Sequence, residues 1–232
     1  IQDGAGNNTA ISLSDDVLSV QPQNDNTTGA FLVKNQGGSN ILAVDTTNSK
    51  LLGGASQTAL NTQYAYFGIS ASHATLPILA DYHYAIHFQN ATYGSAVAVA
   101  FGNGTNPDTS LTISSTADDV TGKLWYIPDN ITIDAVNVFS GASTGGGDTI
   151  DFHLMSYDID TSNDTTGGDL SNGAVIADGA DIVNAGFEQI YYQSMTVQSA
   201  DVDAGKACVF VFSADGTTGN YTISATIKYH IR

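Results

Sequence analysis

Basic residues and glutamate are nearly missing from this sequence of 232 residues. It has six Lys and Arg against 23 Asp and Glu, which gives a formal net charge of −17, and Glu188 is the only glutamate. Exposed helix faces are usually built from Glu, Lys and Arg, so the composition argues against long surface helices. The negative charge also repels nucleic-acid phosphates and anionic lipids, so neither is expected as a partner.

Cysteine and long apolar runs are also scarce. Cys208 is the only cysteine, so the chain forms no intrachain disulfide, which favours assembly in a reducing cytoplasm. Cys208 begins the apolar run 208–212, which predicts a small buried side chain rather than a reactive thiol. No apolar run approaches the roughly 18 residues of a transmembrane helix, so membrane insertion is not expected.

The residues that are abundant favour strands and turns. There are 24 Gly and many Thr, Ser, Asn and Asp, and hydrophobic residues make up 42% of the chain, which is enough for a core. Short runs of strand-forming residues alternate with turn signals, which is typical of an all-β sandwich or barrel. The runs are 64–70, 84–88, 95–101, 109–115, 123–127, 131–139, 148–157, 188–198, 207–213 and 220–231.

The last run has the clearest pattern, because apolar side chains from Tyr221 to Ile231 alternate with polar ones. In 131–139 the alternation slips after Ala135, which predicts a β-bulge or burial on both faces. We therefore expect residues 64–232 to form an antiparallel, jelly-roll-like β-sandwich.

The N-terminal quarter is organised differently. Residues 1–55 are turn-rich and contain one clear hairpin signal, with strands expected at 30–34 and 41–44. Because an isolated hairpin is marginally stable in water, this segment is expected to gain burial from other copies of the chain. Residues 56–63 are expected to be a linker, with Ala59 and Leu60 compatible with a short helical turn.

Two stretches carry a resemblance to a known family. Residues 31–35 (Phe-Leu-Val-Lys-Asn) and 41–50 (Ile-Leu-Ala-Val-Asp-Thr-Thr-Asn-Ser-Lys) together resemble a repeat unit in the trimeric stalks of bacteriophage fibre proteins. Residues 117–134 and 147–157 are similar to a β-sandwich domain of predicted tail-fibre or head-fibre proteins of marine phages. The resemblance implies a virion protein with an attachment or stalk segment followed by a distal sandwich.

This resemblance sets the functional expectation. It implies a non-enzymatic homotrimer whose N-terminal segment binds other virion proteins, assembled in the host cytoplasm and exposed on the extracellular particle. Its sandwich would bind a host-surface glycan or protein through multivalent display. The alternatives are a capsid decoration or head-fibre protein with a purely structural role, a secreted carbohydrate-binding or adhesin domain, and a secreted carbohydrate-active enzyme.

Three Gly- and Asn-rich loops are the expected contact surfaces, because loop tips on rigid strands commonly carry binding residues. They span 102–108, 140–148 and 158–172, and the candidate contact residues are Asn103, Asn106, Ser143 and Asp164. Residues 141–145 also match the G-x-S-x-G pattern of hydrolases, but a strand rather than a helix is expected to follow, so no catalytic role is assigned to Ser143.

A Ca²⁺ loop is the one cofactor site that the spacing suggests. Asp158, Asp160, Asp164 and Asp169 stand at offsets 1, 3, 7 and 12 of an EF-hand-like pattern. The glycine at offset 6 is replaced by Asn163, and no flanking helices are expected. A looser Ca²⁺ loop and a solvated turn both remain open, and no other cofactor is expected.

Histidines and aromatic pairs are weaker candidates. His83 and His87 lie four residues apart in an aromatic-rich segment, and on a strand this spacing separates them by about 13 Å, too far to chelate one ion. Aromatic faces bind sugars by stacking, and three groups could do so. They are Tyr82 with Tyr84, Trp125 with Tyr126, and Tyr191 with Tyr192.

Overall fold

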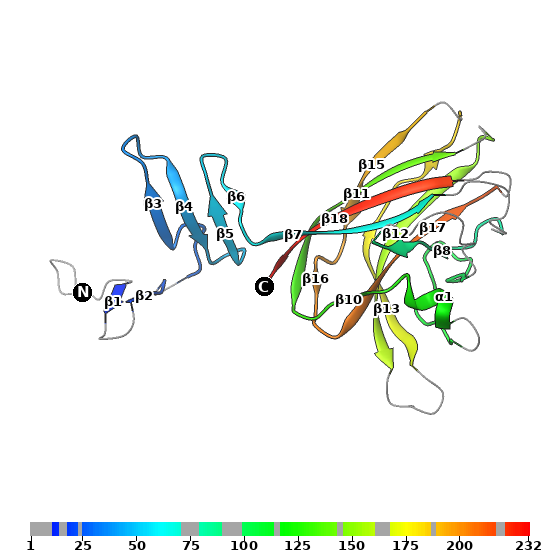
Figure 1. Ribbon diagram of the computed structural model, residues 1–232, viewed down its shortest axis with the longest axis horizontal. Helices are drawn as coiled ribbons and strands as arrows, with labels where there is room; N and C mark the ends of the chain where they lie inside the picture. The colour runs from blue at the N-terminus through cyan, green and yellow to red at the C-terminus, as the bar shows by residue number, and fades with distance from the viewer. Residues whose placement is uncertain are drawn as a thin grey trace. The chain divides into compact units, whose positions relative to one another are not determined.

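The chain folds into two compact units, residues 1–62 and 63–232, in a computed structural model (Figure 1). Strands dominate both units, and every strand pair with a described register is antiparallel, which confirms the all-β prediction. The structure describes residues 11–13, 18–22, 25–70, 79–89, 99–113, 117–142, 146–160, 168–186, 189–216 and 221–232.

The first unit contains two small sheets. β1 (Ile11–Leu13) pairs with β2 (Leu18–Val20), and four further strands form a meander in chain order. These are β3 (Phe31–Lys34), β4 (Asn40–Asp45), β5 (Lys50–Gly53) and β6 (Thr58–Ala59). The turn between β3 and β4 places Gly38 at a positive φ of 83°, a conformation that glycine adopts without strain. The predicted hairpin is therefore confirmed, and the sheet continues beyond it.

The segment expected to be a linker takes part in sheet structure. Within 56–63, β6 pairs with β5, and β7 (Thr62–Ser70) has already begun. The turn before β6 is a β-type turn, in which the amide N–H of Gln57 donates to the carbonyl of Gly54. The short edge strand β6 was not predicted because the composition of this segment is polar.

The second unit is built on one long, twisted antiparallel sheet. Its strands run in the order β10-β17-β12-β13-β15-β11-β18-β7-β9, with β8, β14 and β16 pairing at the sides. The one described helix is α1 (Ala117–Thr121). The remaining strands are β8 (Tyr84–Ala85), β9 (His87–Phe88), β10 (Trp125–Tyr126), β11 (Ile131–Ala142), β12 (Thr149–Asp160), β13 (Asp169–Asp178), β14 (Ile182–Val183), β15 (Tyr191–Val197), β16 (Asp201–Val202), β17 (Lys206–Ala214) and β18 (Tyr221–Ile231).

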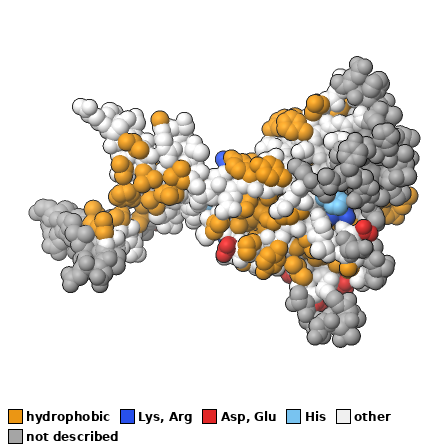
Figure 2. All heavy atoms as spheres, viewed as in Figure 1, with side chains coloured by type: hydrophobic (Ala, Val, Ile, Leu, Met, Phe, Trp, Pro, Cys, Tyr) orange, Lys and Arg blue, Asp and Glu red, His pale blue; other side chains and the backbone are white. Residues whose placement is uncertain are grey.

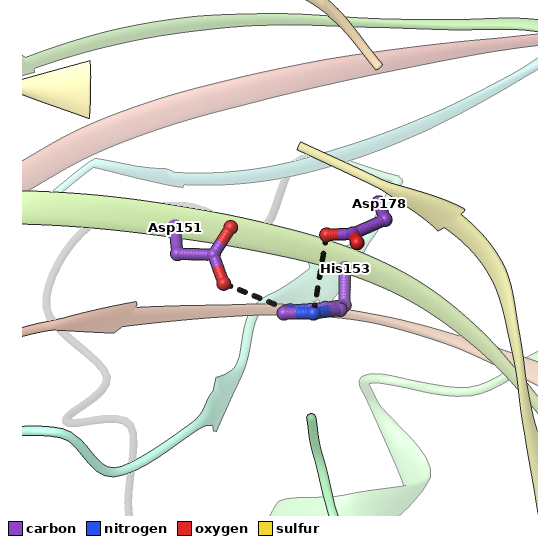
Figure 3. Close-up of side chains that lie close together, drawn as sticks. All are labelled: Asp151, His153 and Asp178. Atoms are coloured by element: carbon purple, nitrogen blue, oxygen red, sulfur yellow. Dashed lines mark ion pairs between the residues drawn. The ribbon is translucent and has the colours of Figure 1, made fainter. Parts of the chain in front are cut away.

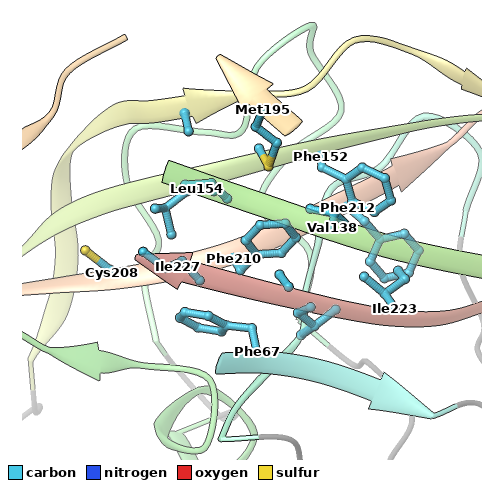
Figure 4. Close-up of a cluster of buried hydrophobic side chains, with 14 of the residues drawn as sticks. Phe67, Val138, Phe152, Leu154, Met195, Cys208, Phe210, Phe212, Ile223 and Ile227 are labelled. Atoms are coloured by element: carbon cyan, nitrogen blue, oxygen red, sulfur yellow. The ribbon is translucent and has the colours of Figure 1, made fainter. Parts of the chain in front are cut away.

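The sheet folds into a sandwich around a single main core. Inward side chains of β7, β11 and β18 pack against those of β12 and β17 (Figure 4). Phe67 and Phe210 meet with their ring centroids 5.9 Å apart, and Phe210 lies 6.1 Å from Phe152. Fully burying a side chain of this size contributes about 1.5–3 kcal/mol, so these aromatic contacts hold the two layers together.

β12 and β17 are buried on their second face as well. There Met155, Tyr157, Val209 and Val211 pack in a separate cluster with Phe101. Two-sided burial explains why β17 is a continuous apolar run rather than an alternating one. It also means that polar side chains on this face of β12 are shielded from water, almost fully for His153 (1% exposed) and in part for Asp151 (20% exposed).

The predicted bulge in β11 is confirmed. The register of β11 with β18 shifts between Ile133 and Ala135, and Asp134 is the extra residue. Its carboxylate lies 3.0 Å from Nδ1 of His230, so the bulge turns a polar side chain toward a partner on β18. After the bulge, the side chains of Val136 and Val138 are buried in the core, as the slip in the sequence pattern indicated.

One long strand, β13, is missing from the sequence prediction. Residues 158–172 were expected to be a contact loop, but 158–160 belong to β12 and 169–172 to β13. Asn172, at φ 50°, and Gly173 have the character of turn residues, and they sit where the register with β12 is irregular.

Other expected boundaries also differ from the structure. Residues 140–142, expected in a loop, end β11, and in the run expected at 109–115 Leu111 forms only an isolated bridge to Leu170. Of the strand expected at 95–101, residues 95–98 lie outside the described ranges.

Gly173 leaves no room for a side chain. A Cβ at this position would lie 2.5 Å from Cε1 of Tyr157 and 2.9 Å from Cα of Thr109. We expect Gly173→Ala to lower the free energy of unfolding by about 1–3 kcal/mol, measured by urea denaturation. Gly141→Ala is the matched control, since its nearest neighbour would be 3.7 Å away; an equal loss in both variants would contradict the packing argument.

Cys208 is completely buried, as its apolar context predicted, and burial raises the pKa of its thiol to about 12. Thiolate is the reactive form, so the native protein is expected not to react with a thiol reagent at pH 8 on the timescale of minutes. The same chain in denaturant should react stoichiometrically at once. Rapid labelling of the native protein would show that β17 opens readily.

Candidate functional site

The meander of the first unit is a single layer with little of its own surface buried. Among residues 25–62, only Ala43 and Asp45 are buried, and all four residues of β3 are exposed. Apolar side chains gather on the face of this unit seen in Figure 2. A stable domain normally needs two packed layers, and the described residues of this unit provide no second layer over the meander.

The strand register shows that both faces of the meander are apolar. Leu32, Ala43, Leu52 and Ala59 lie opposite one another across the four strands, so they share one face, and Ile41 lies two residues from Ala43 on the same side. The other face carries the intervening residues of each strand. These are Phe31, Val33, Leu42, Val44 and Leu51.

The charge on the meander is balanced, unlike that of the rest of the chain. Residues 25–62 contain two acidic side chains, Asp25 and Asp45, and two basic ones, Lys34 and Lys50. Residues 63–232 contain 18 acidic and four basic side chains. Two copies of the meander can therefore approach without net repulsion, whereas two copies of the second unit repel each other.

Three of the four carboxylates of the expected Ca²⁺ loop are described, and each has other neighbours. Oδ1 of Asp158 lies 2.5 Å from Nζ of Lys206, and this hydrogen bond, with a second from Asn172, lowers the pKa of Asp158. Asp160 and Asp169 face each other at the ends of β12 and β13, and Asp169 accepts the amide N–H of Ile113. Among the described residues these side chains form no metal-sized group, and Asp164 lies outside the described ranges.

Two of the four expected contact residues lie within the described ranges. Asn103 and Asn106 are both exposed in the irregular segment after Phe101. Ser143, like Asp164, lies outside the described residues. Neighbouring Pro107 is buried, and the amide N–H of Asp108 donates to the carbonyl of Phe101, so the described part of this loop is anchored to the sandwich.

The exposed aromatic side chains single out one of the three stacking groups. Tyr84 and Trp125 are buried, whereas Tyr192 is 60% exposed and lies directly opposite Phe139, 52% exposed, on β11. Their ring centroids are 5.2 Å apart, and the hydroxyl of Tyr192 donates to Oδ1 of Asn137 at 2.8 Å. This pair therefore presents aromatic surface to solvent next to an amide.

A group that sequence reasoning did not single out lies on the second face of β12. Asp151 and His153 are two residues apart on the same face, and the register places Asp178 of β13 opposite His153 (Figure 3). Nδ1 of His153 lies 3.5 Å from Asp151 Oδ2, and Nε2 lies 3.3 Å from Asp178 Oδ1. The alternation of Asp151 and His153 was visible in the sequence, but Asp178 belongs to the strand that the sequence prediction missed.

Burial controls the protonation of this group. It lowers the pKa of His153 to about 4, so the imidazole is neutral at physiological pH. Burial, with repulsion from Asp178 and Asp181, raises the pKa of Asp151 to about 7. The group thus holds a neutral imidazole beside a carboxylate that is poorly stabilised as an anion.

A second histidine borders the group. His83 is 1% exposed, and its ring meets that of His153 edge-on with centroids 5.2 Å apart. Its Nε2 lies 2.8 Å from the carbonyl of Gly104, while its buried Nδ1 has no hydrogen-bond partner among the described residues. Nδ1 of His153 is likewise buried and makes no hydrogen bond there.

Comparisons of the chain with protein-family models, with curated proteins and with solved structures find no match. Within the described ranges, no helix has the length and apolar character needed to cross a lipid bilayer.

Proposed function

We propose that this chain is a subunit of a homotrimeric structural protein that assembles through residues 25–62 and displays the sandwich of residues 63–232. The observation that carries the proposal is the single-layer meander with two apolar faces. Phe31, Leu32 and Val33 of β3 are each about 40% exposed, and Ile41 of β4 is 50% exposed. Exposed apolar area of this kind, on a sheet that has no second layer among the described residues, is typical of an interaction surface.

Other copies of the same chain are the occupants that fit best. The balanced charge of the meander permits close packing of identical units, and its edge strands β3 and β6 are short enough to limit uncontrolled pairing. A two-fold dimer would cover the same face of both copies and leave the other face in water. In a closed ring, the first face of each meander packs on the second face of the next copy, so both faces of every copy are covered. The smallest such ring is a trimer.

A trimer would convert weak binding by each sandwich into strong binding, because the three sites act at high effective concentration. The resemblance to phage fibre stalks favours a virion protein exposed on an extracellular particle. The rival proposals are a capsid decoration or head-fibre protein without a host ligand, and a secreted adhesin domain. Immunogold labelling of particles with an antibody to the sandwich would separate the virion proposals from the adhesin.

A buried charge in the meander tests the assembly. Val33→Asp replaces an exposed side chain in the isolated subunit, so a monomer should tolerate it. In the trimer it would bury three unpaired carboxylates at about 3 kcal/mol or more each. We expect sedimentation to show loss of the trimer and appearance of the 24.1 kDa chain.

The matched control is Ser39→Asp, which adds the same charge at an exposed position in the turn between β3 and β4. It should leave the assembly intact. Equal sedimentation of wild type and both variants would contradict assembly through this sheet.

Glycan binding by the sandwich is a second candidate function, favoured by the exposed pair of Phe139 and Tyr192. Tyr192→Ala is expected to weaken binding on a glycan array, or adsorption to cells, by about 10-fold. Tyr126→Ala removes an equally exposed tyrosine from β10 and should have no effect. Equal binding by both variants and the wild type would rule out this surface.

A further inference from the structure

We propose that Asp151, His153 and Asp178 bind one divalent transition-metal ion of the Zn²⁺ type. The three side chains come from adjacent antiparallel strands, so their backbone positions are fixed by the sheet rather than by a loop. One ligand atom from each can be chosen such that all three lie within 4.8 Å of one another. This is the spacing at which a single ion can contact all three after small side-chain rotations.

One nitrogen–oxygen distance in the group matches the separation of two metal ligands. The two nitrogen–oxygen distances of 3.3 and 3.5 Å are longer than the roughly 2.8 Å of a charge-assisted hydrogen bond. With metal–ligand bonds of about 2.0–2.1 Å, two ligands of a tetrahedral ion lie about 3.3 Å apart. An imidazole gives one nitrogen to a given ion, so only one of these distances can span it. Nε2 of His153 and Oδ1 of Asp178 already have the separation of two ligands, and the Asp151 carboxylate, which lies beside Nδ1, joins them by rotation.

The donor set selects the class of metal. Imidazole with two carboxylates suits Zn²⁺ and similar first-row ions, whereas Ca²⁺ prefers a shell of oxygen ligands. A neutral imidazole binds a metal through the one ring nitrogen that carries no proton. A divalent ion would also balance the negative charge of the partly buried Asp151 carboxylate.

The neighbourhood provides what a buried metal site needs. His83 holds its Nε2 against the carbonyl of Gly104, which leaves its buried Nδ1 without a proton if Nε2 is the donor. Three protein ligands leave a fourth coordination position, which a water or His83 can occupy. Such an ion would tie β12 to β13, and through His83 to the segment that covers this face of the sheet.

The test uses the full chain stripped of metal with a chelator and dialysed against Zn²⁺. We expect one Zn²⁺ per chain by elemental analysis and a rise in melting temperature of about 5 °C or more at a 100-fold excess over the dissociation constant. Asp178→Asn should weaken binding by about 100-fold or more. The Asp178 side chain is 34% exposed, so this variant is expected to fold.

Asp160→Asn is the matched control, because it makes the same change at the exposed end of β12 and removes a residue of the alternative Ca²⁺ loop. It should leave Zn²⁺ binding unchanged. Loading the wild type with Co²⁺ gives a second readout that does not depend on any variant, namely the intense visible absorption of a four-coordinate ion.

Absence of stoichiometric Zn²⁺ would overturn the proposal, as would equal binding by Asp178→Asn, or binding of Ca²⁺ that Asp160→Asn abolishes. Because the expected stoichiometry is one ion per chain in a monomer or a trimer, the result is independent of the assembly proposal.

Discussion

A sheet with two apolar faces and no second layer in the described part of its unit is the constraint on which this account depends. The meander of residues 25–62 buries only Ala43 and Asp45, so it cannot repay the conformational entropy of ordering its strands within one chain. In the proposed assembly, packing against identical copies removes that deficit, and the balanced charge of the segment permits it. The strongly acidic second unit has its own core, so it can be displayed without contributing to the contact.

In the second unit, the burial of β12 and β17 on both faces is the corresponding constraint. Because β12 and β17 are covered on both faces, polar side chains on the outer face of β12 lie in a poorly solvated environment. Tyr157 meets this constraint by donating its hydroxyl to the carbonyl of Asp108 at 2.7 Å. Asp151 and His153 meet it only partly, since the ion-pair distances are long and Nδ1 of His153 makes no described hydrogen bond. Partly satisfied buried polar groups are uncommon in proteins, and they often mark a binding site.

The sequence indicated much of the fold because its signals were local. The alternation in 221–231, the apolar run at Cys208 and the slip near Ala135 each predicted a feature that the structure confirms. The sequence analysis did not predict β13, because Asn172 and Gly173 have turn character and because the burial of this strand depends on its register with β12. The Asp151–His153–Asp178 group was hidden for the same reason, since pairing between distant strands creates it. The expected Ca²⁺ loop is only partly described: Asp158 pairs with Lys206, which is remote in sequence, and Asp164 lies outside the described residues.

The native mass of the wild-type chain, measured by size-exclusion chromatography with light scattering, tests the central claim most directly. The account predicts a stable species of about 72 kDa, three times the chain mass of 24.1 kDa. A monomer at micromolar concentration would contradict it, because the apolar faces of the meander would then be stable in water without a partner.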